Sequence, residues 1–139
     1  ERAPFRVLLA EDNRVNQRVA LSLLQRMGCQ VDVAANGREA IERGLAARYD
    51  LIFMDCQMPT MDGEQATAEI RRRASGRHVP IVAMTANAMQ GDRERYLASG
   101  MDDYVPKPIC LAALSGVLER WVPRQRGVDV LAPAVRAAS

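Results

Sequence analysis

Short apolar runs alternate along the chain with longer segments whose apolar residues recur at helical spacing. The runs predict five strands, at residues 5–10, 31–33, 51–54, 81–84 and 103–105. The third run is apolar throughout, which is typical of a strand buried on both faces of a sheet. In the second run, polar Asp32 separates Val31 from Val33, and this alternation indicates a strand nearer the edge.

The helical patterns fall between and after these runs. They predict helices at about residues 13–28, 36–47, 63–73, 88–98 and 108–121. In the first helix, we expect Asn13 to cap the N-terminus and Val15, Val19, Leu23 and Leu24 to point into the core. Strands alternating with helices in this way predict right-handed crossovers and a mostly parallel, doubly wound sheet with helices on both faces. The expected fold class is therefore α/β.

Composition adds a boundary near the C-terminus. After Pro123 the sequence becomes rich in Arg, Gly, Pro and Ala, so we predict one domain over residues 1–122 and a tail or linker over 123–139. The chain has 139 residues, 48% of them hydrophobic and 26% charged, which is enough for one domain with its own core. Aromatic residues make up only 4%, so aliphatic side chains must fill that core.

Net charge and cysteine content argue against several classes of protein. A formal charge of +2 is too small to favour nucleic acid or an anionic membrane as a partner. No apolar stretch approaches the roughly 18 residues that span a bilayer, and no signal peptide opens the chain, so we expect a cytoplasmic location. Three cysteines without a CxxC spacing argue against disulfides and zinc, and we expect buried reduced thiols. The chain begins with Glu1 rather than Met, which suggests a fragment of a longer protein.

Polar side chains follow four of the predicted strands. Glu11 and Asp12 come after the first, Asp55 after the third, Thr85 after the fourth and Lys107 after the fifth. Because parallel strands end at one edge of a sheet, where open α/β sheets bind ligands, we expect these groups to converge. Each also has an ordinary interpretation, as a turn aspartate, acids at a helix start, a strand-end hydroxyl or a surface lysine. Their convergence from distant segments favours a functional site.

The residue types in this set point to phosphoryl chemistry. Three carboxylates packed together repel one another and favour a hard divalent cation such as Mg²⁺. Lys107 is the only lysine of the chain and stands between Pro106 and Pro108, which suits a point charge held in a rigid frame. A carboxylate beside Mg²⁺, a lysine and a hydroxyl can attack a phosphoryl group while its neighbours stabilise the charge on the phosphoryl oxygens.

Four sequence strings carry a family resemblance. They are Leu-Leu-Ala-Glu-Asp-Asn at 8–13, Met-Asp-Cys-Gln-Met-Pro at 54–59 with Met-Asp-Gly at 61–63, Met-Thr-Ala-Asn-Ala at 84–88, and Asp-Asp-Tyr-Val-Pro-Lys-Pro at 102–108. In these strings and their spacing, roughly residues 5 to 121 resemble the receiver domains of two-component response regulators. The residues at 11–17 and 54–59 are most similar to those of receivers in hybrid sensor histidine kinases. The resemblance implies a flavodoxin-like sheet of five strands in the order 2-1-3-4-5.

The resemblance also implies roles for the acids at the predicted sheet edge. Asp55 would accept a phosphoryl group from phosphohistidine. Asp12, Asp55 and the backbone carbonyl of Gln57 would ligate Mg²⁺, for which Mn²⁺ can substitute, and Glu11 would hold the metal through water. The peptide bond between Lys107 and the following proline is expected to be cis, as X-Pro bonds can be.

Other residues are implied in binding the phosphoryl group and in responding to it. Thr85 and Lys107 would bind the phosphoryl oxygens. Phosphorylation would draw Thr85 toward the phosphate and let Tyr104 move into the vacated space, which shifts the protein between two packings. Gln57 and Asn87 occupy positions that tune the lifetime of the aspartyl phosphate in this family.

The phosphodonor must come from elsewhere. His78 is the only histidine and lies in a predicted loop, so the expected partner is the dimerisation and phosphoacceptor domain of a histidine kinase or a histidine phosphotransfer protein. We expect no direct contact with nucleic acid or membrane. The domain would phosphorylate and dephosphorylate itself without turning over an external substrate, while its parent protein can be a histidine kinase anchored in the inner membrane.

Two other functions stay open at this point. One is a receiver-like docking module that is regulated by binding alone. The other is a phosphatase with an aspartyl-phosphate intermediate, similar to the haloacid dehalogenase family, which shares the Asp, Thr, Lys and Mg²⁺ set. That family needs a second aspartate two residues after the nucleophile, where this chain has Gln57, so the receiver function is favoured.

Overall fold

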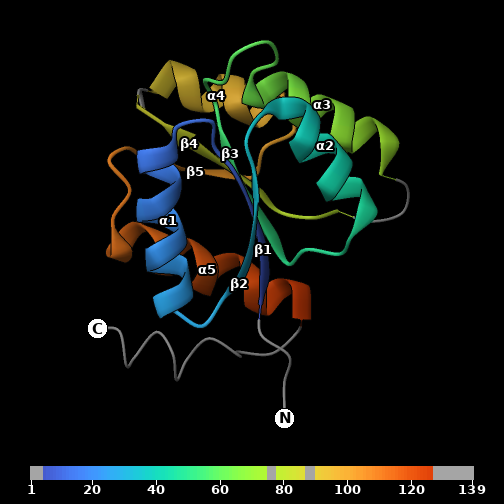
Figure 1. The fold of residues 1–139 in the computed structure, drawn as a ribbon. Helices are drawn as coiled ribbons and strands as arrows, with labels where there is room; N and C mark the ends of the chain where they lie inside the picture. The colour runs from blue at the N-terminus through green and yellow to red at the C-terminus, as the bar shows by residue number, and fades with distance from the viewer. Residues whose placement is uncertain (1–4, 75–77, 87–89, 127–139) are drawn as a thin grey trace.

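The computed structural model describes residues 5–74, 78–86 and 90–126, which form one parallel sheet between two layers of helices (Figure 1). The strands are β1 (Arg6–Ala10), β2 (Gln30–Ala34), β3 (Leu51–Asp55), β4 (Ile81–Thr85) and β5 (Asp103–Pro106). They lie in the order β2-β1-β3-β4-β5, and each neighbouring pair is parallel. The predicted α/β class and strand order are confirmed.

Five helices connect and cover the strands. They are α1 (Arg14–Arg26), α2 (Gly37–Ala46), α3 (Gly63–Arg73), α4 (Gln90–Ala98) and α5 (Leu111–Arg126). Helices α1 and α5 cover one face of the sheet, and α2, α3 and α4 cover the other (Figure 1). This two-sided cover explains why β3 and β4 are buried along their whole length.

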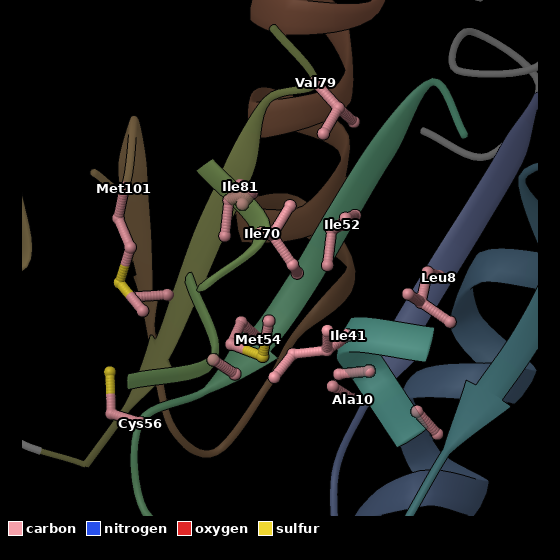
Figure 2. Close-up of a cluster of buried hydrophobic side chains, with 14 of the residues drawn as sticks. Leu8, Ala10, Ile41, Ile52, Met54, Cys56, Ile70, Val79, Ile81 and Met101 are labelled. Atoms are coloured by element: carbon pink, nitrogen blue, oxygen red, sulfur yellow. The ribbon is translucent and has the colours of Figure 1, made fainter. Parts of the chain in front are cut away.

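Alternate residues of the central strands divide the core into two clusters. Val7, Leu9 and Phe53 pack on the side of α1 and α5, whereas Leu8 and Ile52 pack on the side of the other helices. Figure 2 shows the second cluster, where side chains from β1, β3, β4, α2 and α3 meet. The two-residue period of a strand produces this division, and aliphatic side chains dominate both clusters as the composition predicts.

Short polar side chains fix where helices begin at the carboxyl edge of the sheet. The Asn13 side chain accepts the Asn16 N–H at 3.0 Å at the start of α1. Asp62 and Gln65 form a reciprocal capping box at the start of α3. Such caps satisfy N–H groups that the first turn of a helix leaves unpaired. The loops that precede these helices are thereby held in place.

Two valines that were predicted to lie in the core are exposed on α1. The exposed fraction is 69% for Val15 and 44% for Val19, whereas Ala20 and Leu24 are buried. Over the first half of α1, the buried residues therefore lie one position further along the chain than predicted. Both stripes have helical spacing, and the small Ala20 lets the helix approach the sheet, which the apolar pattern alone does not indicate.

The last helix differs from its predicted bounds at both ends. It begins at Leu111 rather than at 108, and it continues to Arg126 rather than ending at 121. It passes through Pro123, whose missing N–H removes one hydrogen bond without ending this helix. Residues 127–139 lie outside the described ranges, so the division into a domain and a tail stays a prediction, as does the start of the fourth helix at 88.

The three cysteines differ in how far they are buried. Cys29 and Cys56 are buried, whereas Cys110, in the loop before α5, is exposed against expectation. Burial raises the pKa of the Cys29 and Cys56 thiols to about 12, so neither is a reactive thiolate near neutral pH.

Among the helices that the structure describes, none has both the length and the apolar character needed to cross a bilayer.

Candidate functional site

Three charged side chains meet at the carboxyl edge of the sheet. Glu11 follows β1, Asp55 is the last residue of β3, and Lys107 follows β5. The Lys107 Nζ lies 3.0 Å from Asp55 Oδ1 and 3.3 Å from Glu11 Oε1. Both carboxylates are buried, and the Lys107 side chain is 21% exposed. Parallel strands therefore bring together groups that lie far apart in the sequence.

Glu11, Asp12 and Asp55 form a cluster that can hold a metal ion. Each offers one carboxylate oxygen, and these oxygens lie within 4.8 Å of one another. Asp12 is exposed, whereas the other two acids are buried. An all-oxygen set that is open to water on one side fits a hard dication such as Mg²⁺, which keeps several water ligands when it binds to proteins. The donor chemistry of these residues therefore fits the predicted metal.

Groups from the neighbouring loops orient the two buried acids. The Asn13 N–H donates to Glu11 Oε2 at 3.1 Å, and the Gln57 N–H donates to Asp55 Oδ1 at 3.1 Å. The Gln17 side-chain amide donates to the Glu11 carbonyl at 2.6 Å. The first two bonds hold the carboxylates in position, which is the arrangement that electrostatic stabilisation of a reacting group requires. The third fixes the backbone of Glu11.

The electrostatics of the site favour a proton or a metal on Glu11. Burial is the largest effect and, with the nearby Asp55 carboxylate, it raises the pKa of Glu11 to about 7, although the Asn13 N–H and Lys107 oppose the shift. Burial acts to lower the pKa of Lys107, but the Asp55 and Glu11 carboxylates outweigh it and raise that pKa above its ordinary value. Lys107 is therefore a stable cation, and Glu11 is readily neutralised by a proton near neutral pH.

The loop from β3 to α3 packs tightly against Asp55. A Cβ atom at Gly63 would lie 2.2 Å from the Asp55 carbonyl oxygen, so only glycine fits there. The Gly63 N–H donates to the Cys56 carbonyl at 3.2 Å and closes the loop. Thr60, in the same loop, has φ 73°, a left-handed conformation that is costly for a β-branched residue. The fold thus maintains a strained loop directly beside the site.

Thr85 ends β4 at the same edge and is 3% exposed. Its hydroxyl forms a hydrogen bond of 2.8 Å with the hydroxyl of Tyr96, a buried residue of α4. Its carbonyl accepts the Lys107 N–H at 2.8 Å, which joins the ends of β4 and β5. The side chain of Thr85 is therefore engaged with a helix in this structure, while its backbone positions the segment that carries Lys107.

The structure describes some of the remaining predicted residues. Gln57 is exposed beside Asp55, and the Lys107–Pro108 peptide bond is cis, as the resemblance implies. Tyr104, on β5, is partly buried, and the Arg93 guanidinium lies 5.9 Å from its ring centre. Asn87 lies outside the described residues. The roles in metal binding, switching and phosphate lifetime stay predictions for all of these residues.

The sequence analysis did not single out Tyr96. Helix α4 is mostly polar, and its weak apolar periodicity gave no reason to expect a buried residue there. One signal was available, because an aromatic residue in a polar helix is notable in a chain that is 4% aromatic. Only the packing of α4 against β4 shows that the tyrosine reaches Thr85.

The chain belongs to the response regulator receiver domain family, because residues 7–119 match that family. The chain is 48% identical over 118 residues to two-component system protein A of Emericella nidulans. That match covers 83% of this chain and 17% of the relative, so the chain spans about one-sixth of the relative's length. The sheet with a lysine and acids at its carboxyl edge is thus that of a phosphorelay receiver.

Two solved structures share this fold. The receiver domain of a Pseudomonas aeruginosa sensor histidine kinase has a TM-score of 0.79 and is 48% identical. The match covers 86% of this chain and 98% of that chain. That domain was crystallised with a magnesium ion coordinated in its active-site cleft. The receiver domain of a Saccharomyces cerevisiae response regulator, crystallised with a histidine phosphotransfer signalling protein, has a TM-score of 0.81 and 36% identity. Coverage there is 88% of this chain and 91% of the other.

Proposed function

We propose that Asp55 of this receiver takes a phosphoryl group from a phosphohistidine, with Mg²⁺ bound beside it, and that the chain acts within a hybrid sensor histidine kinase. The observation that carries the proposal is the pairing of buried Asp55 with Lys107 at 3.0 Å, next to Glu11 and Asp12. A carboxylate held beside a fixed ammonium and a metal-binding cluster has the parts that phosphoryl transfer to an acid needs.

The chain's own residues perform the steps of the transfer. A carboxylate oxygen of Asp55 attacks phosphorus, a P–O bond forms, and the P–N bond to the donor imidazole breaks with its electron pair left on nitrogen. Lys107 and the Thr85 hydroxyl would pair with the phosphoryl oxygens as their charge develops. A Mg²⁺ ion held by the acidic cluster would neutralise more of that charge. The Gln57 N–H, already on Asp55, keeps the attacking carboxylate oriented.

The same residues define how the metal would be held. Asp12, Asp55 and the Gln57 carbonyl would ligate Mg²⁺ directly, and Glu11 would act through a water molecule. The oxygen-rich cluster, with Asp12 open to solvent, supports this assignment. Mn²⁺ would substitute, because it accepts the same oxygen ligands.

The proposed donor is a histidine on another protein or domain. His78 precedes β4, whereas Asp55 ends β3, so the chain's own histidine lies at the opposite edge of the sheet. His78 is also engaged there with Asp102, at 2.7 Å. A histidine phosphotransfer protein or the phosphoacceptor domain of a kinase is therefore the expected partner, and a phosphotransfer protein is the partner of the yeast neighbour.

Acetyl phosphate provides a direct test. With Mg²⁺, the wild-type chain should gain the mass of one phosphoryl group, and Asp55→Asn should gain none. Asp50→Asn is a matched control, because Asp50 lies just before β3, at the opposite end of the strand that carries Asp55. A wild-type chain that gains no phosphoryl group would contradict the proposal and favour a module regulated by binding alone. Equal labelling of Asp55→Asn would contradict the assignment to Asp55 and place the acceptor at another residue.

A further inference from the structure

The hydroxyl groups of Thr85 and Tyr96 form a buried pair between strand β4 and helix α4. Their oxygens lie 2.8 Å apart, and each residue is only 3% exposed. The Asp55 carboxylate, by contrast, is paired with Lys107 and with the Gln57 N–H. The Thr85 side chain is thus held to the helix, while the acid that would carry the phosphoryl group is held by other partners.

Moving the Thr85 hydroxyl away from Tyr96 has a cost. Thr85 has one hydroxyl proton and a small set of staggered rotamers, and its present rotamer is the one that reaches Tyr96. When Thr85 turns away, the buried Tyr96 hydroxyl loses this partner, and the loss of a hydrogen-bond partner costs free energy. Donation from Thr85 to a phosphoryl oxygen on Asp55 therefore competes with the bond to Tyr96.

Tyr96 is anchored, so it cannot simply follow Thr85. Its carbonyl accepts the Ser99 Oγ–H at 2.7 Å and the Met101 N–H at 3.1 Å, which fixes the C-terminal end of α4. The Arg95 guanidinium lies 5.1 Å from the Tyr96 ring centre and pairs with Glu64 of α3 at 3.1 Å. These contacts fix the segment of α4 that carries Tyr96, through Arg95 to α3 and through the Tyr96 carbonyl to the α4–β5 loop.

A hollow beside Thr85 and Tyr96 leaves room for their side chains to move apart. Thr85 and Tyr96 both line an open hollow of about 730 Å³ that also reaches Gln57 and Asp62. A hydroxyl that leaves the bond therefore need not displace the apolar core. The hollow and the anchored tyrosine together allow two states, with the bond made or broken.

We propose that Tyr96 is a positioning residue that restrains Thr85 in its phosphate-free position, so that uptake of a phosphoryl group breaks the bond and releases α4 from β4. The inference rests on the proposed function of Asp55. In this proposal, the hydrogen bond between Thr85 and Tyr96 adds a free-energy cost to phosphoryl binding and also links Thr85 to α4.

The test uses beryllofluoride with Mg²⁺ as a stand-in for the phosphoryl group, and measures its dissociation constant by fluorine NMR. Tyr96→Phe should bind it about fivefold more tightly than wild type, the effect of one net hydrogen bond. In a Thr85→Ala background, Tyr96→Phe should change nothing, because the tyrosine acts only through the threonine. A merely structural role for Tyr96 would alter affinity equally in both backgrounds.

Tyr49→Phe is the matched control. Tyr49 is also buried, and its hydroxyl donates to Asp32 at 2.7 Å, next to β2 and away from Thr85. Its removal should leave beryllofluoride affinity unchanged. A second measurement needs no ligand: methyl NMR should show one Thr85 rotamer in wild type and rotamer averaging in Tyr96→Phe. This experiment also reads the wild-type rotamer directly, whether or not the variant folds.

The outcomes separate the two proposals. Wild type that binds beryllofluoride, with Tyr96→Phe unchanged or weaker, overturns the restraint but leaves the function of Asp55 intact. Several Thr85 rotamers in free wild type also overturn it. Wild type that neither binds beryllofluoride nor takes phosphate from acetyl phosphate overturns the proposed function, and the restraint with it.

Discussion

At the scale of single residues, the site is governed by the balance of charge around Lys107. Its ammonium lies within 3.3 Å of two buried carboxylates, Asp55 and Glu11, with Asp12 close by. One positive charge does not neutralise three acids, so the site gains from a proton on Glu11 or from a dication. Protonation and metal binding are therefore linked.

The first prediction concerns this linkage. Glu11 has a pKa of about 7 in the folded protein against an ordinary 4.5, so the folded state binds this proton more tightly than the unfolded chain. The metal-free protein should lose this part of its stability as pH rises from about 4.5 through about 7. Mg²⁺ must displace the proton, so the increase in Tm caused by Mg²⁺ should be larger at about pH 7.5 than at about pH 5.5.

Glu11→Gln is the control for the linkage. Its amide carries no titrating proton, so much of the pH dependence of the Mg²⁺ effect should disappear. Thermal unfolding with and without Mg²⁺ at both pH values measures this. An equal increase in Tm at the two pH values in wild type would show that Glu11 does not titrate in this range.

A second prediction at this scale removes the cation. Lys107→Met keeps roughly the length of the side chain but leaves the buried Asp55 and Glu11 carboxylates without their cation, so the metal-free protein should lose about 1–3 kcal/mol at about pH 7.5. The loss should be smaller at about pH 5.5, where Glu11 is protonated. Urea unfolding measures both values, and Lys107→Arg, which keeps the charge, should lose less. A loss that is independent of pH would contradict the charge balance described above.

At the scale of elements, the site depends on how closely α3 packs against the end of β3. The space for a Cβ atom at Gly63 is taken by the Asp55 carbonyl oxygen, 2.2 Å away. The first turn of α3 can therefore lie directly on the strand that carries the acid. Helix packing here fixes the position of Asp55 as much as the strand does.

The third prediction tests this close approach. Gly63→Ala should destabilise the protein by about 2 kcal/mol or more, because backbone must move, and it should also weaken beryllofluoride binding at Asp55. Gly116→Ala is a matched control, since among the described residues no atom outside the local backbone of α5 lies within 4 Å of a Cβ at that position. It should stabilise the helix by roughly 0.5–1 kcal/mol. Equal effects of the two variants on urea unfolding would exclude the proposed crowding.

Apolar periodicity predicted which helices and strands form more accurately than it predicted which of their residues are buried. It placed every strand and helix in the correct order, yet it put Val15 and Val19 in the core, where the structure exposes them. It also gave α4 no buried face, although Tyr96 is buried. Periodicity reports the stripe that a helix can bury, whereas the angle at which the helix meets the sheet selects the residues that it does bury.

At the scale of the whole molecule, one acid joins four segments at the edge of the sheet away from the site. Asp102 accepts hydrogen bonds from Arg71 of α3 at 2.7 Å and from the Ile81 N–H of β4 at 2.9 Å, and lies 2.7 Å from His78 Nε2. Arg71 also donates to the Gly100 carbonyl at 3.0 Å. This cluster ties α3, β4 and the α4–β5 loop together.

The fourth prediction is that Asp102 is a main stabiliser of the fold. Asp102→Ala should cost about 2–4 kcal/mol, because it leaves the partly buried Arg71 guanidinium and a strand N–H without their partner. Arg72→Ala, which removes an exposed pair with Glu69 on α3, should change stability little. Urea unfolding of both variants provides the comparison, and a small effect of Asp102→Ala would show that the cluster is compensated elsewhere.

The sequence was enough to predict the fold class and the polar residues that meet at the sheet edge, and the family resemblance that it carries supplied the strand order. It could do so because strand period, helix caps and parallel connectivity are local or topological properties that the chain carries directly. The three-dimensional packing was needed to show that Glu11 and Asp55 share Lys107, that Val15 and Val19 of α1 face outward, and that Tyr96 reaches Thr85. Those features depend on distances between elements, which packing sets and which no stretch of sequence encodes alone.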